Sequence, residues 1–183
     1  MTTPEDVLTY WFAPGPERTA RWFRGDAATD ADVRRRFAST LESAAHGELD
    51  GWAATPRGRL ALIVVLDQFS RNVHRGTARA FAQDAHALAL CVAGLARGDD
   101  RALAPEERAF FYLPLEHAED AAMQARSVAC FEALAAEAPE QSGFVDYARE
   151  HRDVIARFGR FPHRNAILGR RSTPDEEAFL AAG

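Results

Sequence analysis

Apolar side chains recur every three or four residues along most of this chain, which is the spacing of one buried face of an α-helix. One such face predicts a helix from about residue 30 to residue 46 and consists of Val33, Phe37, Leu41 and Ala44. Similar spacing predicts further helices at about residues 4–12, 56–75, 78–97, 105–137 and 142–158, with a short one after residue 173. No stretch alternates in the manner of a β-strand. The pattern therefore predicts an all-α fold.

Caps and helix breakers mark the predicted ends of these helices. Residues 3–6 (Thr-Pro-Glu-Asp) and residues 173–176 (Thr-Pro-Asp-Glu) each combine a capping threonine, a proline and acidic side chains, which is typical of a helix start. Gly47, Gly98 and Gly159 each follow an apolar face. They predict helix ends, because glycine readily adopts the left-handed conformation found at helix C-termini.

The predicted helices form antiparallel hairpins that stack in a single domain over residues 1–183. Residues 41–47 and 92–98 have the same leucine-or-valine to glycine spacing, and an acidic turn and a proline-started helix follow each of them. This weak internal repeat describes two helical hairpins in series, as helical repeat proteins use. Many helical bundles would show the same spacing, so a helical repeat and an ordinary helical bundle both remain open here.

Two segments of the chain lack helical spacing. The first covers about residues 13–28, after a Pro-Gly-Pro break, and Trp22 and Phe23 are expected to hold it against the core. The second is an arginine-rich loop at about residues 160–172. Binding residues are concentrated on such loops in many proteins, so the second segment is a candidate for function.

Charge and composition narrow the possible partners. The chain has 27 Asp and Glu residues against 22 Lys and Arg residues, and its net charge of −5 argues against a nucleic-acid binder. No apolar run approaches the roughly 18 residues that a membrane span needs. The acidic N-terminus is unlike a secretory signal, and Cys91 and Cys130 stand alone in helical patterns. We therefore expect a soluble cytoplasmic protein with reduced thiols and without nucleic-acid or membrane partners.

Common catalytic signatures are missing from the sequence. It lacks G-x-S-x-G, H-E-x-x-H, G-x-G-x-x-G, P-loop and paired C-x-x-C motifs. All 22 Lys or Arg positions are arginine, so there is no lysine for a Schiff base. Arginine remains suited to carboxylates and phosphates through its planar guanidinium group. No resident metal or cofactor is expected, because no segment offers enough metal ligands.

The first of three polar segments, residues 67–75, ends an apolar helix. At helical spacing one face of this helix consists of Leu60, Ile63, Val64, Asp67, Arg71 and His74. This face is apolar at its start and polar at its C-terminal end. Asp67 and Arg71 are correctly spaced for an ion pair one turn apart. Two interpretations remain open: the helix leaves the core here and ends on favourable cations, or Arg71 and Asn72 contact a ligand.

The second polar segment, residues 110–124, contains Pro114, which is expected to kink or divide the helix. If the register continues through it, His117, Asp120 and Gln124 share one face with apolar neighbours. Such groups need partners, so they form either a satisfied network or a ligand site. Asp120 is expected to orient the imidazole of His117, with Glu116 as the alternative.

The third polar segment, residues 157–171, alternates arginine, aromatic and glycine residues in a loop that ends a helix. Its candidate ligand contacts are Arg160, His163, Arg164 and Asn165, while Phe161 is expected to anchor the loop. The alternative interpretation is a docking loop whose arginines cap helix ends and pair with acidic side chains.

Several longer stretches together resemble the bacterial domain-of-unknown-function family 924, over nearly the whole chain. They are Val7-Leu8 with Trp11-Phe12, Arg21-Trp22-Phe23, Gly47-Glu48-Leu49-Asp50 with Trp52, Arg59 to Arg75, Phe111 to Asp120, and Arg157 to Arg170. The resemblance implies an all-helical, tetratricopeptide-like arrangement of helical hairpins. It implies no activity, because none is established for the family.

The leading hypothesis is a binding protein for a small anionic ligand or a peptide carboxylate. Arg71, Arg160 and Arg164 would hold the anion in a concave surface of stacked hairpins, and other polar groups would orient it. The full set of candidate ligand contacts is Arg71, Asn72, His117, Gln124, Arg160, His163, Arg164 and Asn165.

Two alternatives to the binding hypothesis remain open. One is an enzyme in which His117 acts as acid or base, Asp120 or Glu116 orients it, and an arginine stabilises charge. The other is a structural interaction module in which all three polar segments are buried networks. The oligomeric state and the identity of any partner also remain open.

Overall fold

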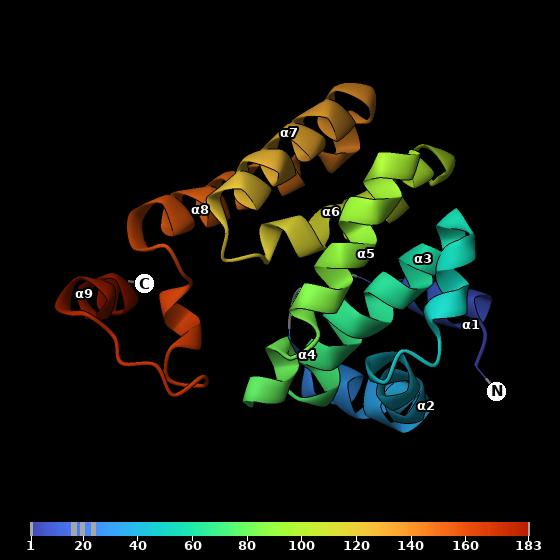
Figure 1. The fold of residues 1–183 in the computed structure, drawn as a ribbon, viewed down its shortest axis with the longest axis horizontal. Helices are drawn as coiled ribbons and strands as arrows, with labels where there is room; N and C mark the ends of the chain where they lie inside the picture. The colour runs from blue at the N-terminus through green and yellow to red at the C-terminus, as the bar shows by residue number, and fades with distance from the viewer. Residues whose placement is uncertain (1, 16–17, 19–20, 23–24, 183) are drawn as a thin grey trace.

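The computed structural model describes residues 2–15, 18, 21–22 and 25–182, and these residues form helices with no strand among them (Figure 1). The α-helices are α1 (Pro4–Trp11), α2 (Ala27–Ala45), α3 (Pro56–Ile63), α4 (Ser70–Val73), α5 (Asp84–Arg97), α6 (Pro105–Glu116), α7 (Ala121–Glu137), α8 (Gly143–Phe158) and α9 (Pro174–Ala182). The predicted all-α class is therefore confirmed.

The caps predicted from the sequence define several helix ends. Thr3 caps α1: its Oγ1 accepts the N–H of Asp6 at 3.3 Å, and the Asp6 carboxylate accepts the N–H of Thr3 at 2.8 Å. The predicted cap of α9, residues 173–176, forms the same reciprocal pair of hydrogen bonds. In contrast, α2 begins earlier than residue 30, because Asp26 accepts two backbone N–H groups and caps the helix there.

The core is built around one helical rod, which consists of α3, the π-helical turn η3 (Val64–Phe69) and α4. Every residue from Leu60 to Leu66 is buried, with an exposed fraction of 1% or less. The rod packs against α1, α2, α5 and α6. The run of apolar residues predicted such a central helix, because a helix that is apolar on all sides has no face for solvent.

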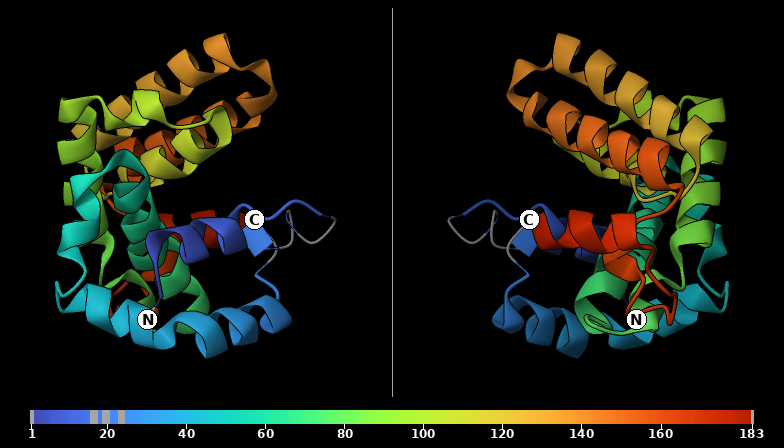
Figure 2. Two further views of the ribbon diagram at one scale, coloured as in Figure 1. Left: turned by 90° about the vertical axis from the view of Figure 1, so that its right-hand side faces the viewer. Right: turned by 90° about the vertical axis from the view of Figure 1, so that its left-hand side faces the viewer.

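The later helices pack in chain order away from this rod. α5 packs on α6, α6 on α7 and α7 on α8, and α8 also contacts α6 (Figure 2). In Figure 1, α6, α7 and α8 lie together in the upper half, while α9 lies at the left beside the short turn η7 (Pro162–Arg164). Packing in chain order agrees with stacked helical hairpins, and the tetratricopeptide-like geometry of that stack stays a prediction.

Two helices that the spacing predicts as continuous are divided in the structure. The segment expected to be one helix over residues 78–97 begins with a short 3-10 turn (Ala78–Phe81), and α5 starts only at Asp84. The tract at residues 105–137 divides after Glu116, whereas Pro114 lies inside α6.

The second of these divisions corrects the predicted face. Asp120 leaves the helical conformation, and its carboxylate accepts the N–H of Met123 at 2.9 Å to cap α7. The register therefore does not continue from His117 to Gln124, and the prediction of one face through His117, Asp120 and Gln124 is wrong.

The described part of the first irregular segment is held on the core by Trp22. Its Nε1 donates a hydrogen bond to the backbone oxygen of Trp11 at 3.0 Å, and its ring centroid lies 4.7 Å from that of Phe110. The predicted anchoring by Trp22 is thus confirmed. Phe23, expected to share this role, lies outside the described residues.

Two other expectations concern covalent structure and membranes. Cys91 and Cys130 are free thiols, as their isolated positions predicted. Within the described ranges, no helix is both long and apolar enough to cross a membrane.

Gly94 of α5 permits a close helix contact that a side chain would block. A Cβ atom at this position would lie 2.5 Å from the Phe111 ring and 2.6 Å from Cδ of Arg59, which is itself fixed by an ion pair to Asp99. We predict that Gly94→Ala destabilises the fold by about 1–2 kcal/mol, because overpacking outweighs the gain of roughly 1 kcal/mol in helix propensity.

Urea unfolding would measure this effect, with Gly143→Ala as the matched control. Gly143 also lies in a helix, but a Cβ there would meet nothing within 4 Å. The control variant should be as stable as the parent or more so. Equal stabilisation of both variants would contradict the predicted contact.

Candidate functional site

The candidate site begins at the π-helical turn η3, which places Asp67 in the apolar rod. A π-turn holds one residue more than an α-helical turn, so it shifts the side chains after it relative to those before it. Asp67 and Arg71 form the predicted ion pair, with Oδ1 and Nη1 3.1 Å apart. His74, predicted on the same face, lines a separate cleft beside Glu42. Such turns are frequent at functional sites, which directs attention to Asp67.

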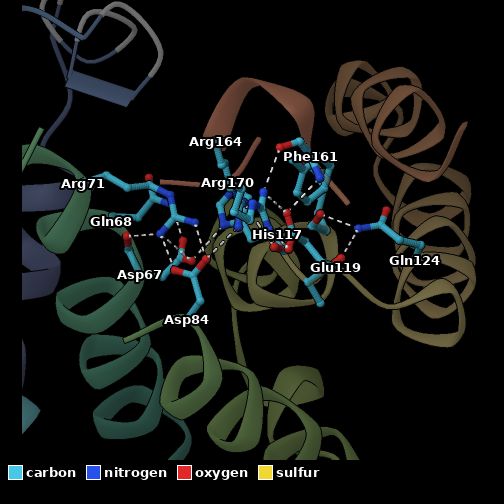
Figure 3. Close-up of polar contacts among 12 residues, drawn as sticks. Asp67, Gln68, Arg71, Asp84, His117, Glu119, Gln124, Phe161, Arg164 and Arg170 are labelled. Carbon is cyan, nitrogen blue, oxygen red and sulfur yellow. Dashed lines mark hydrogen bonds and ion pairs between the residues drawn. The ribbon is translucent and has the colours of Figure 1, made fainter. Parts of the chain in front are cut away.

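Asp67 is a carboxylate in the protein core, with 1% of its surface exposed. It accepts hydrogen bonds from Nδ1 of His117 at 2.7 Å and from Nε2 of Gln68 at 2.5 Å (Figure 3). Burial alone would raise the pKa of Asp67, but the charge of Arg71 and the contact with His117 outweigh it and hold the pKa well below its usual range. Asp67 is therefore ionised at neutral pH.

His117 caps the end of α6 and directs its ring toward Asp67. Burial and the charge of Arg71 lower the pKa of His117, and together they outweigh the opposite effect of Asp67. The imidazole is therefore neutral at neutral pH. Because Nδ1–H of His117 donates a hydrogen bond to the Asp67 carboxylate, the neutral ring carries its proton on Nδ1. The tautomer assigned from this hydrogen bond leaves a lone pair on Nε2. Asp67 thus holds the orienting position that was expected of Asp120.

Glu116, the last residue of α6, is the second unusual carboxyl group of the site. Burial raises its pKa to about 8, with smaller contributions from the charges of Asp67 and Glu150. Its Oε1 lies 3.6 Å from Nδ1 of His151, and its Oε2 is buried without a hydrogen-bond partner among the described residues. His151 donates to the backbone oxygen of Tyr147 at 2.8 Å, and burial lowers its pKa to about 4. At neutral pH, Glu116 is therefore mostly a carboxylic acid and His151 a neutral imidazole.

These side chains line one pocket with a volume of about 290 Å³, which we call the aromatic pocket. Its apolar lining consists of Trp22, Phe110, Leu113, Phe144 and Tyr147. Its polar lining consists of Gln68, Arg71, Glu116, His117 and His151. Apolar walls with a few converging polar groups are typical of small-molecule sites. The predicted residues that the structure brings together here are Arg71, Glu116 and His117.

Asp84, at the start of α5, joins two arginines in an ion-pair cluster (Figure 3). Arg71 donates to both Asp84 oxygens, at 3.0 and 3.2 Å, and Arg164 donates to Oδ2 at 3.1 Å. With Asp67, the cluster contains two cations and two anions. The guanidinium charges are therefore largely neutralised by the protein, which weakens the predicted clamp for an anion.

Arg164 lies outside the lining of the aromatic pocket and is 6% exposed. Besides Asp84, its guanidinium contacts the backbone oxygen of His117 at 3.1 Å. Its Cζ lies 4.6 Å from the ring centroid of Phe81 and 4.5 Å from that of Phe161. Phe161 thus anchors the loop as expected, and Arg164 ties η7 to the end of α6.

Two further candidate contacts take part in internal hydrogen bonds. Asn72 donates to Oδ1 of Asp30 at 2.8 Å and links α4 to α2. Gln124 donates to the backbone oxygens of Glu116 at 2.6 Å and Ala118 at 2.8 Å, which closes the open end of α6. Neither residue lines the aromatic pocket.

The remaining candidates in the arginine-rich loop also lie outside the aromatic pocket. Arg160 donates to Glu176 of α9 at 2.7 Å, and Asn165 contacts the same carboxylate at 3.3 Å. His163 is exposed, with its ring centroid 5.6 Å from that of Phe161. These contacts match the docking-loop interpretation, in which arginines pair with acidic side chains.

Four polar groups of the site were absent from the predicted set: Asp67, Gln68, Asp84 and His151. Asp67 was visible as an acid in an apolar face, but its partner fifty residues along the chain was not. His151 had a usable signal, because it interrupts an apolar face of α8 at helical spacing from Phe144 and Ile155. Asp84 had none, because nothing in its neighbourhood distinguishes it from an ordinary acidic first turn.

The described residues offer no group of three or more His, Cys, Asp or Glu side chains that fits a metal ion. The Asp67 carboxylate already interacts with Gln68, Arg71 and His117. It could bind a metal ion only by losing some of these contacts. The expected absence of a resident metal or cofactor stays a prediction.

The described residues thus form an all-helical protein with a pocket that has both apolar and polar lining. The sequence matches the family described as "Bacterial protein of unknown function (DUF924)" over residues 7–183, and the chain belongs to this family. A solved structure, that of the protein of unknown function ATU0120 from Agrobacterium tumefaciens, is similar with a TM-score of 0.88 and 42% sequence identity. The match covers 98% of this chain and 97% of the other. The comparison with curated proteins gave no match.

The raised pKa of Glu116 makes stability depend on pH. Its folded value of about 8 lies above its ordinary value of 4.5, so the folded state binds more protons between these pH values. Stability must then fall as pH rises through this window, by up to about 5 kcal/mol. We predict that Glu116→Gln removes this loss and makes the variant more stable than the parent at pH 9, with little difference at pH 5.

Thermal or urea unfolding at pH 5, 7 and 9 would measure this difference. Glu140→Gln, on the exposed turn before α8, is the control and should unfold with the pH dependence of the parent. Parallel curves for the parent and Glu116→Gln would show that Glu116 is ionised in the folded state.

A second prediction concerns Arg164. We expect Arg164→Ala to destabilise the fold by about 2–4 kcal/mol. This is somewhat less than the loss for a buried charge left without any partner, because Asp84 still pairs with Arg71 in the variant. Arg171→Ala, at an exposed position that forms no ion pair with the described residues, should change stability by less than about 0.5 kcal/mol. Urea unfolding measures both. Unchanged stability of Arg164→Ala, with loss of an anion-dependent rise in melting temperature, would instead favour the ligand-clamp role predicted from the sequence.

Proposed function

We propose that this protein is an enzyme that moves protons on a small molecule bound in the aromatic pocket. The observation that carries the proposal is the 2.7 Å hydrogen bond between Asp67 and Nδ1 of His117. A buried carboxylate in this position orients the imidazole, fixes its tautomer and stabilises the imidazolium that forms when the ring accepts a proton. Nε2 of His117 is the free basic atom of this pair, so we assign His117 as general base.

Glu116 is suited to the complementary role of general acid. With a pKa raised to about 8 by burial, it holds a proton at neutral pH, and its carboxyl group lines the same pocket as His117. A pair of groups with pKa values shifted apart is what acid–base catalysis needs. In one cycle His117 accepts a proton from the substrate or from water, and Glu116 donates one. Exchange with solvent then restores both groups.

The pocket lining sets the class of substrate. A volume of about 290 Å³ fits a molecule of fragment size, and aromatic side chains make up most of the apolar lining. The charge of Arg71 in the lining is balanced by Asp67 and Asp84, which favours a substrate with an apolar or aromatic body and at most one weakly charged group. Among the described residues no serine, threonine or cysteine lines the pocket, so we assign proton transfer and not a covalent acyl-enzyme step.

A second candidate is binding without chemistry, as the leading sequence hypothesis expected. It is favoured by Arg71, whose side chain lines the aromatic pocket and remains 19% exposed. Arg71 would then receive a ligand carboxylate at the edge of its pair with Asp84. The two candidates share the pocket and differ in whether the bound molecule exchanges protons.

The test uses a panel of small aromatic carboxylic acids, ketones, phenols and esters in D₂O, observed by NMR. Ligands bound by the parent should incorporate deuterium or turn over, and His117→Gln should slow this by about 10²- to 10⁴-fold with affinity little changed. Asp67→Asn should also slow the exchange, because the imidazole loses its charged partner. Glu116→Gln should retain binding and lose the acid-dependent step.

Tyr147→Ala is the control for the location of the site. Tyr147 lines the pocket but is 55% exposed, so this variant should keep its fold and bind pocket ligands more weakly. Binding without any exchange or turnover in the parent would leave only the binding candidate. Ligand affinities that Tyr147→Ala does not change would place the site elsewhere and contradict both candidates.

A further inference from the structure

A second cleft, which we call the α7 cleft, has no described lining residue in common with the aromatic pocket. It has a volume of about 560 Å³ and lies between α6, α7 and the 3-10 turn η5 (Asp99–Ala102). Ala129 and Ala133 of α7 are one helical turn apart in its lining, and their small side chains leave the space open. Its charged lining consists of Asp100, Arg101, Arg108, Arg126 and Glu137.

Two of the three arginines in this lining differ from most other arginines that the structure describes. Among the arginines that the structure describes, all but Arg101, Arg126 and Arg171 have a side-chain hydrogen bond or ion pair. Arg171 and Arg101 are both exposed, but Arg101 lines the same cleft as Arg126, whereas Arg171 lies on a loop elsewhere. Arg126 is in addition half-buried. No nitrogen of Arg126 is among the buried polar atoms that lack a partner, so its guanidinium is open to the cleft and free to bind an acceptor there.

The carboxylates of the cleft are already occupied. Asp100 accepts the hydroxyl hydrogen of Tyr112 at 2.7 Å, and Glu137 pairs with Arg108. Three guanidinium groups therefore face two engaged carboxylates, which leaves a local excess of positive charge on a chain whose net charge is −5. Arg101 and Arg126 retain free planar forks, which match the oxygens of phosphate and carboxylate groups.

We propose that the α7 cleft binds a small anion that carries phosphate or carboxylate groups, with Arg126 and Arg101 as its main contacts. The anion supplies the acceptors that the protein does not provide to these two side chains. Arg108, already hydrogen-bonded to Tyr112 at 3.2 Å, adds positive charge at the side of the cleft. The site is separate from the proposed proton-transfer pocket and does not depend on it.

Isothermal titration with pyrophosphate, citrate and inorganic phosphate tests this proposal. The parent should bind at least one of them at millimolar concentrations, more weakly as the salt concentration rises. Arg126→Gln and Arg101→Gln should each raise the Kd by about 10- to 100-fold, because each removes charge-assisted hydrogen bonds. The control is Arg152→Gln, because Arg152 is paired only with the neighbouring Asp153 on α8; the Kd should stay within about twofold of the parent.

Alkylation of Cys130 provides a readout at the cleft itself. Cys130 lines the cleft and is half-buried, whereas Cys91 is 0% exposed and does not compete for reagent. Pyrophosphate or citrate should slow alkylation of Cys130 in the parent and have no effect in Arg126→Gln. The absence of binding by all three anions would overturn the proposal. So would binding that Arg126→Gln retains and Arg71→Gln loses, because it would place the anion in the aromatic pocket.

Discussion

The burial of one negative charge, on Asp67, determines much of the surrounding structure. A carboxylate in an apolar core loses several kcal/mol of hydration, and it is tolerated only if donors surround it. Here the donors come from the rod itself, through Gln68 and Arg71, and from the end of α6, through His117. Because these elements are distant in sequence, the requirement to satisfy Asp67 sets where α6 ends against the rod.

Two helix irregularities make this arrangement possible. The π-turn η3 holds Asp67 in the otherwise apolar rod, and the end of α6 leaves backbone oxygens without helical partners. Side chains from other elements donate hydrogen bonds to those oxygens. Gln124 donates to the backbone oxygens of Glu116 and Ala118, and Arg164 donates to that of His117. These hydrogen bonds fix the end of α6, where Glu116 and His117 line the aromatic pocket.

The sequence predicted the local features of this fold better than the long-range ones. Threonine caps, the glycine stops and the buried run from Leu60 to Leu66 are visible in a few neighbouring residues, and all of these appear in the structure. The partner of His117 was assigned to Asp120, three residues away, because helical spacing was the only geometry available. The structure uses Asp67 instead, since a cap at Asp120 interrupts the register. Neither the π-turn nor the role of Asp84 has a signal in composition or spacing.

Asp84 serves two arginines at once, and this has a thermodynamic consequence. Arg71 belongs to the pocket wall, and Arg164 fastens the C-terminal segment to the body of the protein. A carboxylate shared in this way links the two: whatever draws Arg71 away from Asp84 strengthens the hold of Asp84 on Arg164, and detachment of Arg164 strengthens its hold on Arg71. A pocket ligand that draws Arg71 away from Asp84 would therefore be coupled to docking of the C-terminal segment, and by reciprocity each would change the equilibrium of the other by the same factor.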